Sequence, residues 1–267
     1  MSLTDLDHLS LRLLDIAAQA AFKVEGLLLE GFASNVATEE KANRHDLVTA
    51  YDHKSEETII NFILNQHSDS QILGEEGGHR GNGAVQWFID PIDGTMNFIN
   101  GIPFFNVSIA AALEGQMLAG VIYDPVRHEM FSASTAGAFL NAQPIRAVGH
   151  PTEAEALLLT DFPYADQPIT DNDYDLFAAM VKHFRSVRRI GSAALELAYV
   201  ACGRADVAFL GLGSAWDVAA GMMLIEQAGG QYLPIERLAT GMWPPSRCVA
   251  TCAGFDVEQS VLKTLVG

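Results

Sequence analysis

The sequence predicts a mixed α/β or α+β protein because of the order in which strand-like and helix-like segments follow one another. Consecutive β-like runs dominate the first half, whereas helical and β-like segments alternate in the second half. Layered folds that pack helices on sheets have this order of elements. We therefore expect a single domain over 1–267, built from two packed lobes of roughly 1–150 and 151–267 with an indistinct boundary near 144–155.

Apolar residues at helical spacing predict a long first helix from Leu6 to Leu28 that ends near Gly31. A polar segment from Ser34 to Asp46 then reads as a loop or weak hairpin. The same helical spacing predicts helices over 51–65, 174–183, 192–202, 215–228 and about 256–265.

Runs of β-branched and apolar residues, bounded by turn residues, predict the strands. The segments are 71–74, 85–89, 106–113, 117–123, 129–134, 157–159, 186–188, 207–210 and 249–252. The strand that begins at Val85 is expected to stop at Asp90, because Pro91 lacks a backbone donor and restricts the residue before it.

Composition excludes several classes of protein. Hydrophobic residues make up 49% of the chain and charged residues 18%, which are globular values. The formal net charge of -17 disfavours nucleic-acid binding through a basic face. Three cysteines provide no disulfide framework, and no uninterrupted apolar run is long enough to span a membrane. The N-terminus lacks the pattern of a signal peptide, so we expect a cytoplasmic protein.

The densest chemical signal is the segment Trp87 to Phe98, which contains Asp90-Pro-Ile-Asp-Gly-Thr95. A buried strand would deliver Asp90 to its end, and the turn at Pro91 could present two carboxylates and the Ile92 carbonyl on one side. Three oxygens at this spacing suit a hard cation such as magnesium. A plain Asx turn with a helix N-cap is the alternative interpretation, and taken alone this short motif favours it.

Each of the other candidate carboxylates also has both a functional and a purely structural interpretation. Glu75 and its neighbour Glu76 could meet a cation or form an exposed acidic turn. Asp217 begins an almost wholly apolar helix, where it could be a metal ligand or a cap. Asp52 could cap a helix, or it could accept a proton from Thr95 and so orient a water.

The combination of these motifs resembles the inositol monophosphatase family over essentially the whole chain. The matching segments are Lys41 with Asp46–Asp52, Gly74–Glu76, Trp87–Phe98, Gly101–Pro103, Val107–Ile109, Trp216–Gly221 and Gly229–Gly230. The Asp-Pro-Ile-Asp-Gly-Thr block with the late Trp-Asp pair is specific for the wider superfamily of lithium-sensitive, magnesium-dependent phosphatases.

The resemblance implies an αβαβα sandwich of the sugar-phosphatase type, commonly a homodimer, that binds two or three Mg²⁺ ions per site. It implies phosphomonoester hydrolysis by metal-activated water, without a covalent phosphoenzyme. The implied metal ligands are Glu75, Asp90, the Ile92 carbonyl, Asp93 and Asp217. Glu75, Asp52 and Thr95 would be catalytic, Gly94 and Thr95 would bind phosphate, and Lys41 would lie on a loop near the metals.

The substrate-side residues depart from the pattern of inositol-specific members. Those members usually carry a glutamate, which hydrogen-bonds inositol hydroxyls, at the position that matches Leu210. We hypothesise that Leu210 weakens polyol recognition. The segment around Ser192 and Ala193 does match the family's other substrate-side segment, although small residues there also suit helix packing.

Inositol 1-phosphate is therefore the leading substrate on family grounds. Fructose 1,6-bisphosphate, nucleotide 3′-phosphates and histidinol phosphate are the competitors. A non-catalytic regulatory protein that reuses the fold is the alternative from another class, since a bacterial branch of the family is associated with RNA-processing and transcription complexes. The match at Glu75, Asp90, Asp93, Thr95 and Asp217 favours catalysis.

Overall fold

A computed structural model describes residues 3–32, 34, 38–40, 47–164, 168–235 and 243–266. Its helices are α1 (Leu3–Phe32), α2 (Ala50–Gln66), α3 (Thr95–Ile99), α4 (Asp171–His183), α5 (Ala193–Ala201), α6 (Ala215–Gln227) and α7 (Lys263–Val266), with a 3-10 turn at Val257–Gln259. Its strands are β1 (Thr38–Glu40), β2 (Leu47–Thr49), β3 (Ser70–Gly74), β4 (Gly78–Gly81), β5 (Val85–Asp93), β6 (Asn106–Leu113), β7 (Gln116–Asp124), β8 (Glu129–Ser134), β9 (Gly137–Leu140), β10 (Gln143–Pro144), β11 (Leu157–Thr160), β12 (Ser186–Arg188), β13 (Val207–Leu210), β14 (Gln231–Pro234) and β15 (Cys248–Thr251).

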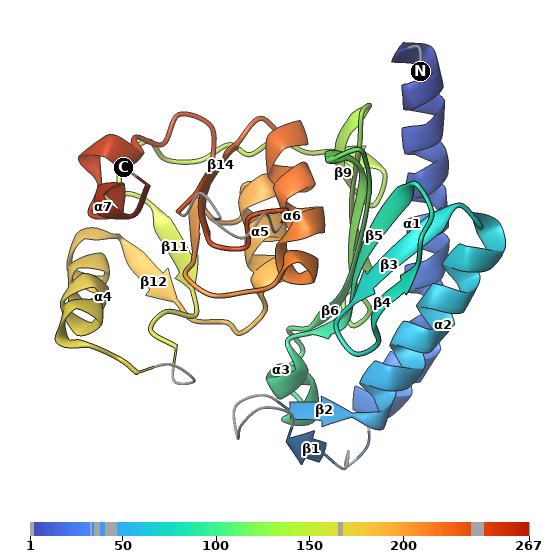
Figure 1. The fold of residues 1–267 in the computed structure, drawn as a ribbon. Helices are drawn as coiled ribbons and strands as arrows, with labels where there is room; N and C mark the ends of the chain where they lie inside the picture. The colour runs from blue at the N-terminus through green and yellow to red at the C-terminus, as the bar shows by residue number, and fades with distance from the viewer. Residues whose placement is uncertain are drawn as a thin grey trace.

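Two mixed sheets organise the fold. The larger has eight strands in the order β10-β9-β8-β7-β6-β5-β3-β4, and the smaller has five in the order β12-β11-β13-β15-β14. Helices α1 and α2 cover the outer face of the large sheet, α5 and α6 lie between the sheets, and α4 and α7 lie beyond the small sheet (Figure 1). The implied αβαβα layering is therefore confirmed.

Burial of both faces explains why the central strands read as continuous apolar runs. Along β6, Val107 and Ile109 pack with α1 and α2, whereas Ala110 faces the layer of α5 and α6. In β5, Trp87 belongs to the first of these clusters and Phe88 to the second. A third apolar cluster fills the space between the small sheet and its outer helices.

The end of β5 differs from the sequence expectation. The strand does not stop at Asp90 but continues through Pro91 to Asp93, which pairs with Asn106 of β6. The register shifts between Asp90 and Asp93, and a proline can occupy such a bulge because no ladder hydrogen bond is required of it. The Ile92 N–H instead donates to the Asp90 carboxylate at 3.0 Å.

The expected helix over 256–265 was wrong. The chain forms a 3-10 turn and then the short α7, with Ser260 in an extended conformation between them. The Ser260 hydroxyl donates to the Val257 carbonyl and accepts from the Leu262 N–H, so it competes with the helical hydrogen bonds.

Strands β4, β9, β10 and β14 were also not predicted. The described parts of 34–46 support a hairpin, because β1 pairs antiparallel with β2.

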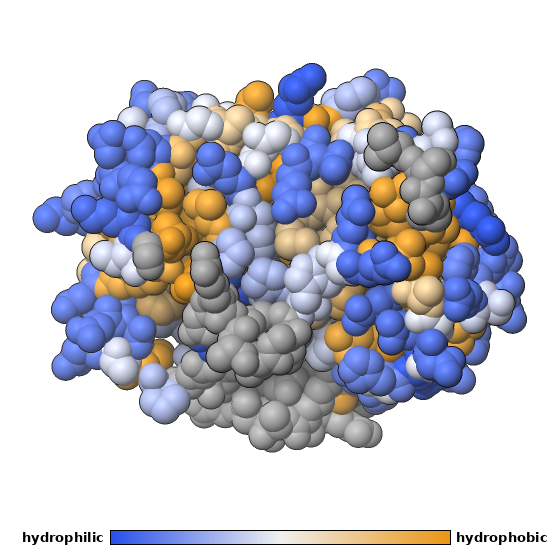
Figure 2. All heavy atoms as spheres, turned by 45° about the horizontal axis from the view of Figure 1, so that its top comes forward, coloured by the Kyte–Doolittle hydropathy of each residue, from blue (hydrophilic) through white to orange (hydrophobic). Residues whose placement is uncertain are grey.

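The surface is mixed in character. Figure 2 shows one face on which hydrophilic residues cover much of the area and hydrophobic residues gather in separate patches between them. Within the described residues, no helix is both long enough and apolar enough to cross a membrane. The three cysteines are free thiols; Cys248 and Cys252 are buried, as expected for core positions.

Two helical glycines make a matched test of packing between the central helices. A Cβ on Gly221 of α6 would lie 2.4 Å from the Leu197 side chain of α5, whereas a Cβ on Gly26 of α1 would meet nothing within 4 Å. We expect Gly26→Ala to stabilise the protein by about 0.5–1 kcal/mol through helix propensity. Gly221→Ala should destabilise it, because overpacking costs about 1–3 kcal/mol and exceeds the same propensity gain. Urea unfolding of both variants measures this; equal stabilisation by both would contradict the close α5–α6 packing.

Candidate active site

The parallel pairing of β3 with β5 brings the first two acidic segments together. Both strands run in the same direction, so their carboxyl ends lie at the same edge of the large sheet. Glu75 follows β3 directly, and its N–H donates to the Ile89 carbonyl of β5 at 3.1 Å. Asp90 comes one residue later in β5. The two acidic segments of the sequence are therefore neighbours in space.

The start of α6 adds the third segment. The Ser108 hydroxyl of β6 donates to the Trp216 carbonyl at 3.1 Å and so holds the first turn of α6 against the large sheet. One Asp217 carboxylate oxygen accepts from the Ser214 N–H at 2.6 Å. Asp217 thus caps its own helix, as its alternative interpretation proposed, and also faces the other carboxylates.

The electrostatics show that these carboxylates converge. Burial raises the pKa of Asp90 well above its usual value, and the nearby charges of Glu75, Asp93 and Asp217 raise it further. Burial likewise raises the pKa of Asp217 to about 8, although the Ser214 N–H opposes the shift. Like charges that face one another in a buried site disfavour ionisation unless a cation or a shared proton offsets them.

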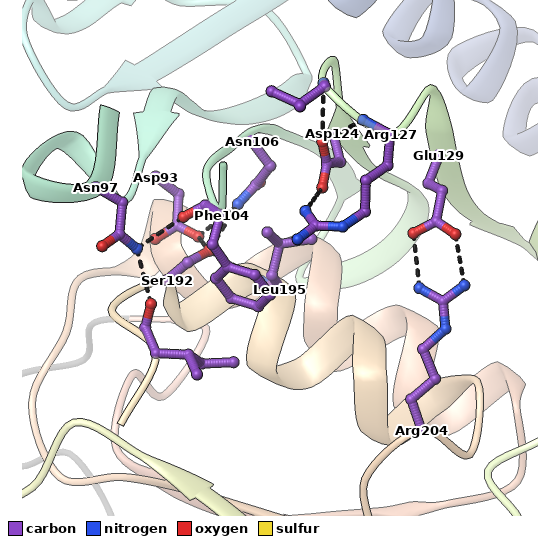
Figure 3. A network of polar contacts seen from close by, with 12 residues as sticks. Asp93, Asn97, Phe104, Asn106, Asp124, Arg127, Glu129, Ser192, Leu195 and Arg204 are labelled. Atoms are coloured by element: carbon purple, nitrogen blue, oxygen red, sulfur yellow. Dashed lines mark hydrogen bonds and ion pairs between the residues drawn. The ribbon is translucent and has the colours of Figure 1, made fainter. Parts of the chain in front are cut away.

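Asp93 is held by a dense set of donors from both halves of the chain (Figure 3). The Asn106 amide donates to its carboxylate at 2.6 Å and the Ser192 hydroxyl at 2.5 Å. The N–H groups of Ala193 and Ala194, at the start of α5, donate at 3.1 and 3.0 Å. Burial still raises the pKa of Asp93 to about 6, and these hydrogen bonds limit the rise.

Asn97 of α3 makes a second link between the two halves. Its amide nitrogen donates to the Phe104 carbonyl at 2.8 Å and to the Ile190 carbonyl at 2.7 Å (Figure 3). The preceding Gly94 has a φ of +91°, and a Cβ there would lie 3.0 Å from the Gly191 and Phe104 carbonyl oxygens. Only glycine suits that conformation at such a close approach.

Thr95 and Asp52 form the expected pair, although the contact is long. The Thr95 hydroxyl lies 3.4 Å from one Asp52 carboxylate oxygen and 2.9 Å from the Ile92 carbonyl oxygen. The other Asp52 oxygen accepts from the Thr49 N–H at 2.8 Å and from the Thr49 hydroxyl at 2.6 Å. Asp52 is fully buried, so it is a helix cap that also reaches the candidate site.

Oxygen is the only donor type that these residues offer to a cation. As the side chains stand, no three His, Cys, Asp or Glu residues among those described surround a point where they could hold a metal ion together. Glu75 and Asp217 lie close enough to Asp90 to raise its pKa through like charge, and a bound cation would offset this repulsion. Magnesium usually takes one or two carboxylates with several waters rather than a complete protein cage, so the donor set fits it.

Comparisons with known proteins identify the family and the fold. The model of the inositol monophosphatase family matches residues 11–261. This chain belongs to the inositol monophosphatase family. A Pseudomonas aeruginosa protein named Nus factor SuhB is 41% identical over 227 residues, which cover 82% of this chain and 83% of that protein. Inositol monophosphatase 3 of Solanum lycopersicum is 36% identical over 225 residues, covering 81% and 84% of the two chains. The structure of inositol monophosphatase from Anabaena sp. PCC 7120 has a TM-score of 0.80 at 34% identity and covers 95% of this chain and 94% of that one.

The substrate-side residues implied by family resemblance occupy different environments. Ser192 is buried and its hydroxyl is engaged with Asp93, while Ala193 is partly exposed beside it. Leu210 is only 1% exposed and packs in the central apolar cluster. As it stands, Leu210 therefore contributes to the core rather than to an open pocket. Lys41 lies outside the described residues.

Several polar residues near the family's site were not singled out from the sequence. Asn97 and Asn106 lie within or beside quoted motifs, but only the fold shows that they bridge the two halves of the chain. Asp161 follows β11, accepts from the Gly191 N–H at 3.0 Å and remains partly exposed. Glu56 and Glu196 look like ordinary helical glutamates in the sequence, yet both are buried.

Glu196 of α5 is an isolated buried carboxyl group. It is 0% exposed, and within the described residues neither of its oxygens makes a hydrogen bond. Burial raises its pKa well above the usual value, and the charges of Asp161 and Asp93 raise it further. The nearby Ile190 N–H group acts to lower the pKa of Glu196. It does not form a hydrogen bond with either Glu196 oxygen. Burial and the two nearby carboxylates therefore disfavour the ionised form of Glu196 more than they would at an exposed position.

Glu196→Gln should change how stability depends on pH. The pKa of Glu196 is higher in the folded protein than in the unfolded chain. Its contribution to the free energy of unfolding is therefore complete below the unfolded pKa near 4.5 and is lost as the pH rises toward the folded pKa. Glutamine cannot ionise, so the variant should gain stability over the wild type between pH 5 and pH 8. Urea unfolding at both pH values, in metal-free buffer, measures the gap; a gap independent of pH would contradict the assignment. Glu57→Gln, at an exposed position of α2, serves as the charge control.

Proposed function

We propose that this protein is a magnesium-dependent phosphomonoesterase that hydrolyses a small phosphorylated metabolite. The convergence of Glu75, Asp90, Asp93 and Asp217 at one partly buried edge of the large sheet carries the proposal. Membership of the inositol monophosphatase family supports it. A cytoplasmic homodimer inhibited by lithium is the form expected for such an enzyme by family resemblance.

The proposed metal ligands are the four carboxylates with the Ile92 carbonyl oxygen. Two or three Mg²⁺ ions, when bound, would lower the pKa of a coordinated water and offset charge on the phosphate oxygens. The chain supplies a rigid frame for these ligands. Asp93 is fixed by four donors from β6 and the start of α5, so its carboxylate needs little reordering on binding.

Asp52 and Thr95 are proposed to orient the attacking water. When the Thr95 hydroxyl donates its hydrogen to Asp52, its oxygen is free to accept a hydrogen from water. In the present arrangement that hydrogen is shared with the Ile92 carbonyl, which is the nearer acceptor. Because the Ile92 oxygen is also a proposed ligand, its engagement would leave Asp52 as the acceptor. The 3.4 Å contact is therefore consistent with a pair that tightens on binding.

Phosphate binding is assigned by the same resemblance to the main-chain N–H groups of Gly94 and Thr95. The packing of Gly94 against Gly191 and Phe104 supports this assignment, because it holds the start of α3 in one position. For the rest of the substrate, Ser192 and Ala193 are the proposed neighbours. Inositol 1-phosphate is the leading candidate on family grounds. Leu210 is buried and cannot accept hydrogen bonds from inositol hydroxyls, so one of the contacts expected for this substrate is missing.

Phosphate release from a substrate panel is the direct test. The panel contains inositol 1-phosphate, fructose 1,6-bisphosphate, a nucleoside 3′,5′-bisphosphate and histidinol phosphate, each with and without magnesium. We expect magnesium-dependent release from at least one member, because the site provides oxygen ligands for a hard cation. Release that does not require a divalent cation would contradict the proposal.

Asp93→Asn should remove turnover while leaving the protein folded. The amide keeps the size of the side chain but removes the negative charge of a proposed direct ligand. The loss should therefore exceed the about 10–100-fold typical of changes to the partners of metal ligands. Asp7→Asn, at an exposed position of α1, is the matched control and should retain full activity. Magnesium-supported activity in Asp93→Asn would refute the ligand assignment.

A regulatory binding role is the second candidate, and one specific observation favours it. Relatives from several bacteria carry the name Nus factor SuhB, including the one from Pseudomonas aeruginosa. If magnesium binds but no member of the panel is hydrolysed, this candidate or an untested substrate would take first place. A binding role would also survive Asp93→Asn, which separates the two functions.

A further inference from the structure

Glu56 of α2 holds the turn that carries Glu75. Its side chain is buried, with 2% exposure. One carboxylate oxygen accepts from the Glu76 N–H at 2.9 Å, and the other accepts from the Gly77 N–H at 2.6 Å. Both oxygens are thus engaged by the main chain directly after Glu75. Burial raises the pKa of Glu56, and these two N–H groups oppose the rise because they stabilise the charged form.

The glycines around Glu75 fit this contact. A Cβ on Gly74 would lie 2.3 Å from one Glu56 oxygen, and a Cβ on Gly77 would lie 2.8 Å from the other. A side chain at either position would displace the Glu56 carboxylate. The Gly-Glu-Glu-Gly sequence therefore wraps closely around a carboxylate that comes from a different element of the fold.

One face of α2 thereby serves two parts of the candidate site. Asp52 and Glu56 are four residues apart, so their side chains project from the same face of the helix. Asp52 contacts Thr95, whereas one turn later Glu56 binds the turn beside Glu75. The position of α2 consequently sets Thr95 and Glu75 relative to each other.

We propose that Glu56 is a positioning residue that sets the magnesium affinity of the site by holding Glu75 toward Asp90. This inference rests on the proposed function. Glu75 and Asp90 do lie within hydrogen-bonding reach of each other. Glu56 would act through the turn, because its two oxygens accept from the main-chain N–H groups of Glu76 and Gly77. Partners of metal ligands commonly change metal affinity by about 10–100-fold.

Magnesium titration by calorimetry, with phosphate release measured in parallel, tests the inference. In Glu56→Gln one oxygen becomes an NH₂ group that faces a backbone donor, so the turn should loosen. We expect the magnesium Kd, and the magnesium concentration for half-maximal activity, to rise about 10-fold. The kcat at saturating magnesium should change much less. Glu57→Gln, one residue along and exposed, should match the wild type in both measurements.

Two further variants separate positioning from a loss of stability. Ile60→Val creates a small cavity in the buried face of the same helix and should lower stability without changing the magnesium Kd. Gly77→Ala disturbs the contact from the side of the turn and should raise the Kd even if Glu56→Gln does not fold.

The outcomes are distinct. An unchanged magnesium Kd in folded Glu56→Gln or in Gly77→Ala, with an active wild type, would overturn the role of Glu56 alone. An equal rise in Ile60→Val would also overturn it, because general destabilisation would then explain the effect. A wild type that binds no magnesium and releases no phosphate would overturn the proposed function together with this inference.

Discussion

The constraint on which the site and its surroundings depend is the concentration of carboxylates at one partly buried edge of the large sheet. Asp90 and Asp217 are both raised in pKa by burial and by neighbouring carboxylates, so the folded chain opposes their ionisation. A fold can keep such groups only if donors or a cation compensate them. Here main-chain N–H groups provide part of the compensation, as the Ser214 N–H does for Asp217. What they leave uncompensated is the electrostatic basis of the proposed magnesium site.

The same constraint explains how the two halves of the chain are joined. Asp93 belongs to the large sheet, yet two N–H groups at the start of α5 and the Ser192 hydroxyl donate to it. Asn97 adds a bond to the Ile190 carbonyl from α3. Asp93, a proposed metal ligand, therefore also links the large sheet to α5. A substitution that removes its side chain would disturb the packing of α5 as well as the proposed metal site. Removing the charge of Asp93 while keeping its shape is thus a cleaner probe than truncating it.

Local patterns predicted most of the central elements, since both β6 and β13 have their expected bounds. Patterns failed where a side chain from elsewhere decides the outcome. Pro91 looked like the end of a strand, but pairing with β6 carries β5 past it through a bulge. No pattern singled out Glu56, because nothing local shows that the turn after β3 folds over it. The carboxylates proposed as metal ligands could be singled out only because family resemblance joined motifs that each had an equally good structural explanation.

The substrate side shows why a single substitution is an incomplete guide to specificity. Leu210 pairs with Cys248 across the small sheet, and Glu196 lies close enough to that cysteine to raise its pKa when ionised. A second carboxylate at position 210 would thus enter a layer that already holds a buried acid without hydrogen-bond partners among the described residues. Leucine at this position is compatible with Glu196, whereas two buried acids would repel on ionisation. Asp161 has a different environment: it stays partly exposed and binds the Gly191 N–H, next to the residues that hold Asp93. Polar recognition of a substrate is therefore physically easier at the segment around Asp161 than at position 210.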